Sequence, residues 1–144
     1  MPLTYYSTAP AFKNALHDAL GARSGLSGVT VSYGAPTGAP REFIALTDIS
    51  GSQEFAALGA LRKDETYVLT VFCSVLREGN QQQECTERAF ALAAEIEDEL
   101  RGNVTMSGTV RVAELTTPFQ LEEFASDQAR QSIVTLGIQA TERI

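Results

Sequence analysis

The sequence predicts an α+β fold, with a mostly antiparallel sheet and two helices packed on one face. Two segments place apolar residues three and four positions apart, as one face of a helix requires, and several others alternate apolar with polar residues, as strands do. The second helical segment divides the strands into an earlier and a later group, which favours helices on one side of an antiparallel sheet. With 144 residues, 44% of them apolar, the chain suits one domain over residues 1–144.

Composition and charge exclude several classes of protein. The 11 Lys and Arg against 18 Asp and Glu give a net charge of −7, which is opposite in sign to what binding of phosphate backbones needs. No apolar run approaches the roughly 18 residues of a membrane span, and the N-terminus lacks the pattern of a signal peptide, so we expect a soluble cytoplasmic protein with no membrane partner. Two cysteines and one histidine are too few for a disulfide scaffold or a histidine-rich metal site.

The first expected element is a helix, followed by a short strand. Thr8 is a suitable N-cap, and Gly21 or Gly25 can supply the left-handed residue that ends the helix. The apolar face of this helix consists of Phe12, Ala15, Leu16, Ala19 and Leu20. Alternation over residues 29–33 then predicts a strand with one solvent-exposed face.

Two irregular segments flank the next strand. Residues 34–41 contain two prolines and two glycines, so we expect a loop, whereas 42–47 is a short strand of mostly apolar character. Residues 48–64 break the strand pattern, because glycines and polar residues are mixed with large apolar ones. The apolar residues are Phe55, Leu58 and Leu61. We expect an extended hairpin loop there that a partner covers.

A central strand and a long helix follow. Residues 65–76 are apolar on both faces, as in a central strand. Asn80 and Gln83 have the spacing of a capping box, and Gly102 is placed to end the helix in the left-handed conformation. The apolar stripe of this helix consists of Cys85, Ala89, Leu92, Ala93, Ile96 and Leu100. We expect the helix to lie across the sheet.

Two strands are expected after this helix. Met106, Val110 and Val112 are in phase for a strand, which breaks at Pro118. Residues 134–141 alternate apolar with polar side chains, which predicts a half-buried strand close to the C-terminus.

The residues that could carry catalysis are few. Cys73 lies within the expected central strand and Cys85 on the apolar stripe of the second helix, so both are interpreted as small core residues. His17, which is the one imidazole that could activate a thiol, lies at the border of the first helix's apolar face. We therefore expect no catalytic residues and no cofactor.

Acidic residues gather near the end of the second helix. Glu95, Asp98 and Glu99 are three and four positions apart, so they are expected to share one solvent-exposed face, while Glu97 points elsewhere. Negative charge is unfavourable at a helix C-terminus. One interpretation is that these acids serve a purpose other than helix stability, and the other is that they merely form a solvated face. Divalent metal binding by these carboxylates remains a further alternative.

The layout of nearly the whole chain resembles that of the tail terminator proteins of long-tailed bacteriophages. These proteins are similar to the lambda minor tail protein U, and the resemblance is to members from actinobacterial phages and prophages. The segments that carry the resemblance are GVTVSYG at 28–34, FIAL at 43–46, LGALRKDETY at 58–67, ERAFAL at 87–92 and VTLGIQA at 134–140.

The resemblance implies a virion structural protein without enzymatic activity. Such proteins form a homo-hexameric ring on the last ring of the tail tube, stop polymerisation of the major tail tube protein and join the tail to the head–tail connector protein. DNA passes through the ring without specific binding. The implied location is the virion tail, with assembly in the cytoplasm of the host bacterium.

The resemblance also suggests roles for particular residues. The hairpin segment is expected to reach a neighbouring subunit or the tube, and loop 34–41 to form part of a second contact patch, because a ring of identical subunits needs two different patches per copy. The interface residues are Phe55, Leu58, Leu61, Arg62, Pro36 and Pro40. The acids Glu95, Asp98 and Glu99 would line a lumen that repels DNA.

Two alternatives remain open from the sequence. A head-completion or neck protein of the same phage type can share this size and fold, and its binding partner would distinguish it. The other alternative is a small metal-dependent α+β enzyme, which would use the acids at 95–99, or Cys85 with His17.

Overall fold

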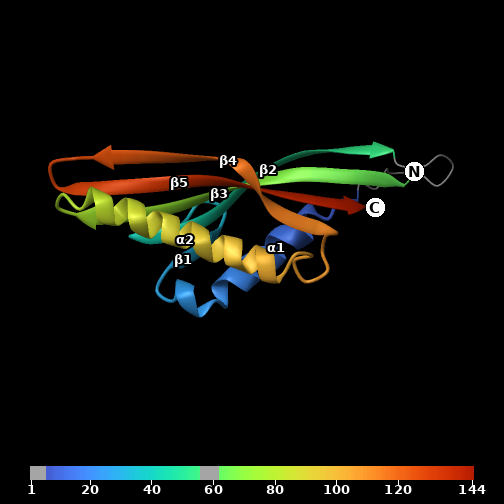
Figure 1. The fold of residues 1–144 in the computed structure, drawn as a ribbon, viewed down its shortest axis with the longest axis horizontal. Helices are drawn as coiled ribbons and strands as arrows, with labels where there is room; N and C mark the ends of the chain where they lie inside the picture. The colour runs from blue at the N-terminus through green and yellow to red at the C-terminus, as the bar shows by residue number, and fades with distance from the viewer. Residues whose placement is uncertain (1–5, 56–61) are drawn as a thin grey trace.

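The computed structural model describes residues 6–55 and 62–144. Figure 1 shows two helices and a long, twisted sheet. The elements are α1 (Ala9–Gly21), the 3₁₀ helix η1 (Ser24–Leu26), β1 (Thr30–Tyr33), β2 (Glu42–Phe55), β3 (Lys63–Glu78), α2 (Gln82–Gly102), β4 (Val112–Ala125) and β5 (Ala129–Arg143). In the part of the chain that the structure describes, no helix is long and apolar enough to cross a membrane.

The five strands form one sheet in the order β1-β2-β3-β5-β4. β1 pairs with β2 in parallel, and the other neighbouring pairs are antiparallel. β3 pairs with β2 on one side and with β5 on the other along nearly its whole length, which confirms the predicted central strand. The edges of the sheet are β4 on one side and, on the other, β1 and the distal half of β2.

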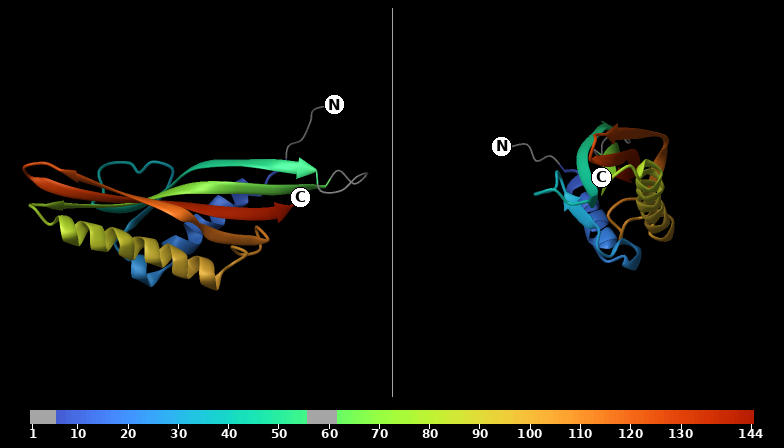
Figure 2. Two further views of the ribbon diagram at one scale, coloured as in Figure 1. Left: turned by 45° about the horizontal axis from the view of Figure 1, so that its top comes forward. Right: turned by 90° about the vertical axis from the view of Figure 1, so that its left-hand side faces the viewer.

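Both helices cover the same face of the sheet, as the two views in Figure 2 show. α2 packs on β3, β4 and β5, whereas α1 packs on β1 and β2. One apolar core joins the helices to the alternating inward positions of β3 and β5, and it includes the predicted stripe of α2. The predicted fold class, an α+β fold with a mostly antiparallel sheet and two helices, is therefore confirmed.

The predicted helix ends are wrong in detail. Gly21 and Gly102 are the last residues of α1 and α2, and neither they nor Gly25 has a positive φ. Asn80 and Gln83 do not form a capping box, because α2 begins after Gln81 without a side-chain cap. Its first turn is instead fixed to β5, where the Gln82 amide donates to the Ser132 hydroxyl and to a backbone carbonyl.

The segment predicted to be irregular at 48–64 is mostly strand. β2 continues through it to Phe55 and pairs with β3, after a register shift between Leu46 and Ile49. Gly51 allows this pairing, because a Cβ there would lie 2.4 Å from both the Thr66 carbonyl oxygen and the Tyr67 Cβ. The hydrogen bonds that order this segment come from β3, so the local pattern did not reveal them.

The strand predicted around Met106 and Val110 is also corrected. Met106 has φ 43° and lies in a turn that the Asn103 side chain closes by accepting from the Ser107 amide at 2.8 Å. Met106 and Val110 are buried in the core, so their apolar character reflects packing rather than a strand. β4 starts later and continues past Pro118, where the register shifts, because an edge strand tolerates a residue without an N–H.

Candidate functional site

The two cysteines and the histidine are placed as structural residues. Cys73 is fully buried in β3, and burial raises the pKa of its thiol to about 12. Burial also raises the pKa of Cys85, whose Sγ donates to the Arg130 carbonyl. His17 packs edge-on against Tyr33 and its Nε2 lies 3.1 Å from the Val31 carbonyl oxygen. His17 lies on α1 and Cys85 on α2, and the structure does not pair them.

The acids of α2 are placed differently from expectation. Arg23, which follows α1, binds Glu95 at 2.8 Å and Glu99 at 3.3 Å, and both carboxylates are half-buried. The hydrogen bond with Glu95 raises the pKa of Arg23. The expectation that Glu95 and Glu99 share an open solvent face with Asp98 is wrong, because they turn toward Arg23 and only Asp98 is exposed.

Gly25 has a role in this ion pair rather than in ending α1. A Cβ on Gly25 would meet the Glu95 carboxylate, with 1.9 Å to Oε1. The glycine thus lets the 3₁₀ helix η1 approach α2 closely. Among the described residues, no group of three or more His, Cys, Asp or Glu side chains is arranged to hold a metal ion.

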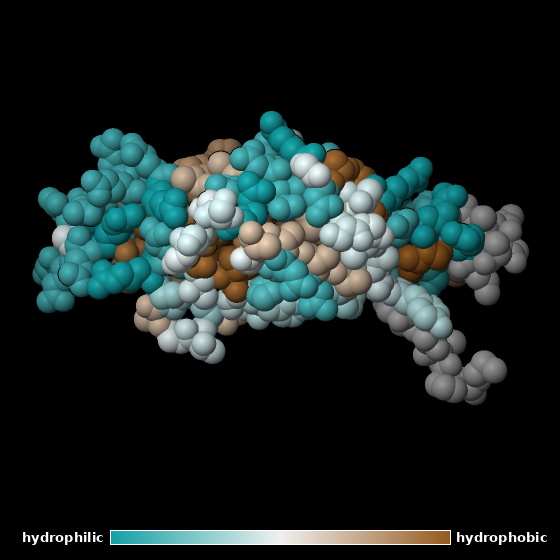
Figure 3. Space-filling model, turned by 90° about the horizontal axis from the view of Figure 1, so that it is seen from below, coloured by the Kyte–Doolittle hydropathy of each residue, from teal (hydrophilic) through white to brown (hydrophobic). Residues whose placement is uncertain are grey.

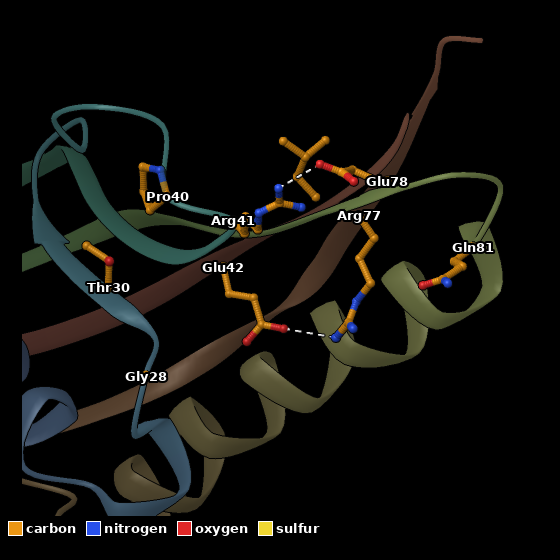
Figure 4. Close-up of a pocket in the computed structure, with 9 residues that line it drawn as sticks. Gly28, Thr30, Pro40, Arg41, Glu42, Arg77, Glu78 and Gln81 are labelled. Atoms are coloured by element: carbon orange, nitrogen blue, oxygen red, sulfur yellow. Dashed lines mark hydrogen bonds and ion pairs between the residues drawn. The ribbon is translucent and has the colours of Figure 1, made fainter. Parts of the chain in front are cut away.

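A polar pocket of about 630 Å³ lies between loop 34–41, the start of β2, the end of β3 and the start of α2 (Figure 4). Glu42 is held by two guanidinium groups, those of Arg77 at 3.1 Å and Arg88 at 3.2 Å. Arg41 pairs with Glu78 at 2.8 Å, and both of these side chains are largely exposed. Each of these charged groups has an ion-pair partner within the chain, so the ion pairs stabilise this end of the sheet and the pocket is not lined by unpaired charges.

Loop 34–41 borders this pocket. Pro40 lines it, and Pro36 is half-buried elsewhere in the loop. The 14 residues of β2 join loop 34–41 to Phe55, which at about 3.3 Å per residue separates the two by on the order of 40 Å. Loop 34–41 and the described hairpin residues Phe55 and Arg62 therefore lie at opposite ends of β2.

The hairpin tip, which we define as Phe55, Arg62 and Lys63, presents an exposed aromatic ring with a basic side chain beside it. Phe55 is 71% exposed and the Lys63 ammonium lies 5.7 Å from the centre of its ring. Arg62 is exposed. Leu58 and Leu61, which were assigned to the same interface, lie outside the described residues.

A surface that the sequence analysis missed lies between α2 and β4. Phe90 of α2 and Phe119 of β4 form an edge-to-face pair with ring centres 5.9 Å apart, although they are 37% and 63% exposed. No periodic pattern marks either residue, because Phe90 lies off the apolar stripe of α2 and Phe119 follows the register shift at Pro118. Figure 3 shows several apolar patches spread among polar side chains on the helix-bearing face.

Comparison with known proteins identifies a fold. No protein-family model matches the chain, and no curated protein matches it. Among solved structures, 29 chains match. One of them belongs to a structure described as the virion of a native gene transfer agent (GTA) particle, with a TM-score of 0.65, 14% sequence identity, and coverage of 95% of this chain and 99% of that chain. The two chains therefore share an architecture over almost their full lengths.

Proposed function

We propose that this chain is a structural protein of a phage-like virion and that it acts as a tail terminator. It forms a six-membered ring on the end of the tail tube, stops addition of further tube subunits and presents a surface to the head connector. The observation that carries the proposal is the likeness in fold to a chain of a gene transfer agent virion, which extends over 95% of this chain and 99% of that one.

The shape of the molecule supports a ring. A ring of identical copies needs two different patches on each copy. One patch of each copy then contacts the other patch of the next copy. The hairpin tip and the pocket end of the sheet lie at opposite ends of β2, and the hairpin tip exposes an aromatic ring. An elongated subunit with dissimilar ends fits this requirement.

Charge supports passage of DNA rather than its retention. The chain carries a net charge of −7, so a ring of six copies as a whole would repel phosphate groups. Of the three acids assigned to the lumen, Glu95 and Glu99 are partly neutralised by Arg23, which leaves Asp98 as the exposed one. We propose that any contribution of this helix to the lumen comes mainly from Asp98.

The test of the proposed function combines mass and imaging. Light scattering on a sizing column gives the mass of the free protein, and negative-stain images are taken after mixing it with purified tail tubes. We expect six-fold rings, either free or capping tube ends. A monomer or dimer that ignores tubes but binds a head connector would replace the tail terminator with a neck protein, and a protein that binds neither would overturn the virion proposal.

A further inference from the structure

The surface between α2 and β4 combines apolar side chains with an acidic border. A pocket of about 340 Å³ lies there, with Leu100, Val104 and Leu115 in its lining. The Phe90–Phe119 pair lies further along the same two elements, since Phe90 precedes the pocket residue Glu97 by seven positions on α2, about 10 Å. We call this pocket and aromatic pair together the α2–β4 surface.

The charged groups along the α2–β4 surface are mostly acidic. Glu97 and Glu114 line the pocket, and Glu123 lies on β4 beyond Phe119, where its carboxylate accepts from the Thr86 hydroxyl of α2 at 2.7 Å. The basic group in the pocket lining is Arg101, which pairs with Glu97. An apolar surface with this border suits an apolar ligand group that carries positive charge.

The hairpin tip of the same chain has the complementary chemistry. Phe55 and Lys63 are partners across the hairpin, so their side chains point to the same side, with the ammonium close to the ring. Glu54 and its partner Asp64 point to the other side of the hairpin, where Asp64 is paired with Arg143 at 2.9 Å. The side of the tip that carries Phe55 is therefore aromatic and basic.

The tip cannot reach the α2–β4 surface of its own chain. Phe119 pairs with Leu136 and Leu136 with Val71 of β3, whereas Phe55 pairs with Lys63 at the start of β3. Eight residues of extended β3 separate these levels, which corresponds to about 26 Å. Any contact between the tip and this surface is consequently made between two copies.

We propose that the α2–β4 surface is the docking site for the hairpin tip of a second copy of this chain. Phe55 packs against the Phe90–Phe119 pair, and the Lys63 ammonium beside it faces the acidic border. The contact is heterologous, so repetition of it gives a ring or a filament. This inference rests on the proposed function, because it specifies which two surfaces join the subunits of the ring, with the α2–β4 surface in place of loop 34–41 as the partner of the hairpin tip.

Cysteine cross-linking tests the contact directly. A chain with both Phe55→Cys and Phe119→Cys is oxidised, with tail tubes present if the free protein is a monomer, and covalent oligomers are counted on a non-reducing gel. The matched control pairs Phe55→Cys with Phe124→Cys, because Phe124 is 47% exposed on β4 but points to the opposite face of the sheet. The native Cys73 and Cys85 are fully buried and do not compete.

We expect a ladder of disulfide-linked oligomers from the first variant and mainly monomer from the control. We also expect Phe119→Ser to weaken self-association at least tenfold, as loss of an aromatic anchor does, while Phe124→Ser leaves it unchanged. If rings form but the ladder is absent and Phe119→Ser associates normally, the proposed docking site is wrong, while the proposed ring is still supported. If the unmodified chain forms no ring with or without tubes, the proposed function itself fails.

Discussion

Glu65 of β3 holds the first turn of α1 in place through Thr8, which lies 57 residues earlier in the chain. One carboxylate oxygen accepts from the Thr8 backbone N–H at 2.9 Å and from its hydroxyl at 2.8 Å. Because that hydroxyl proton is donated to Glu65, the Tyr67 hydroxyl donates to the Thr8 oxygen at 3.0 Å. Thr8 is thus the N-cap residue, as predicted, but its side chain binds the sheet instead of the helix.

We predict that Glu65→Gln destabilises the protein by about 1–3 kcal/mol, because a buried amide would replace an acceptor of several hydrogen bonds and leave donors unpaired. Glu65 is only 4% exposed, and its second oxygen accepts from Gln53 at 2.7 Å. Urea unfolding measures the change. Glu54→Gln, on an exposed neighbouring position of β2, is the control and should change the free energy of unfolding by less than about 0.5 kcal/mol.

The same carboxylate makes stability depend on acid pH. Burial alone would raise the pKa of Glu65, but hydrogen bonds from Ser7, Gln53 and Thr8 outweigh it and hold the pKa below the ordinary 4.5. The folded protein therefore binds this proton more weakly than the unfolded chain does. The stability that Glu65 contributes is fully present above pH 4.5 and is lost as the pH falls through its folded pKa. Between pH 6 and 3, the midpoint temperature of thermal unfolding should fall less steeply for Glu65→Gln than for the unmodified protein. If the two proteins lose the same number of degrees, Glu65 is not the source of the pH dependence.

Removal of Arg23 should destabilise the contact between α2 and the segment after α1. Arg23→Ala leaves the Glu95 and Glu99 carboxylates close together without their shared cation, so we expect a loss of about 1–2 kcal/mol. Arg101→Ala is the matched control, because the exposed Arg101–Glu97 pair is within one helix and worth about 0.5 kcal/mol or less. Equal effects in guanidinium unfolding would show that the Arg23 pair contributes no more than a surface pair.

Gly51→Ala should destabilise the distal part of the β2–β3 hairpin. A Cβ at this position meets the Thr66 carbonyl oxygen and the Tyr67 Cβ, which are backbone or attached to it and cannot move aside. We expect a loss of about 2 kcal/mol or more. Gly21→Ala provides the contrast, because it is helical and has nothing within 4 Å of an added Cβ, so the free energy of unfolding should rise by up to about 1 kcal/mol. Hydrogen exchange of the 48–55 amides would localise the effect of Gly51→Ala.

The thiols should be unreactive in the folded protein. Cys73 and Cys85 are fully buried and burial raises the pKa of each, so neither supplies a thiolate near neutral pH. An aromatic disulfide reagent at pH 8 should label both cysteines in urea and neither in buffer. Rapid labelling of Cys85 in buffer would contradict this burial and would favour the enzyme alternative.

The sequence by itself determined the elements whose signal is local. The central strand β3 and the buried stripe of α2 follow from periodicity, because a half-buried strand or helix repeats its apolar side at a fixed interval. The order of the helices and strands gave the α+β class in the same way. Phe55 was singled out because a large apolar residue interrupts the polar, glycine-containing pattern of its segment.

Only the tertiary structure decided the features that depend on distant partners. The distal half of β2 is a strand because β3 supplies its hydrogen bonds, and the ends of both helices are set by neighbouring elements. Glu95 turns away from solvent because Arg23, 72 positions earlier, lies beside it, and Phe90 meets Phe119 only across the gap between α2 and β4. Periodicity shows which side of a helix or strand is buried, but not which other element packs against it. The candidate surfaces depend on that packing, so only the tertiary structure reveals them.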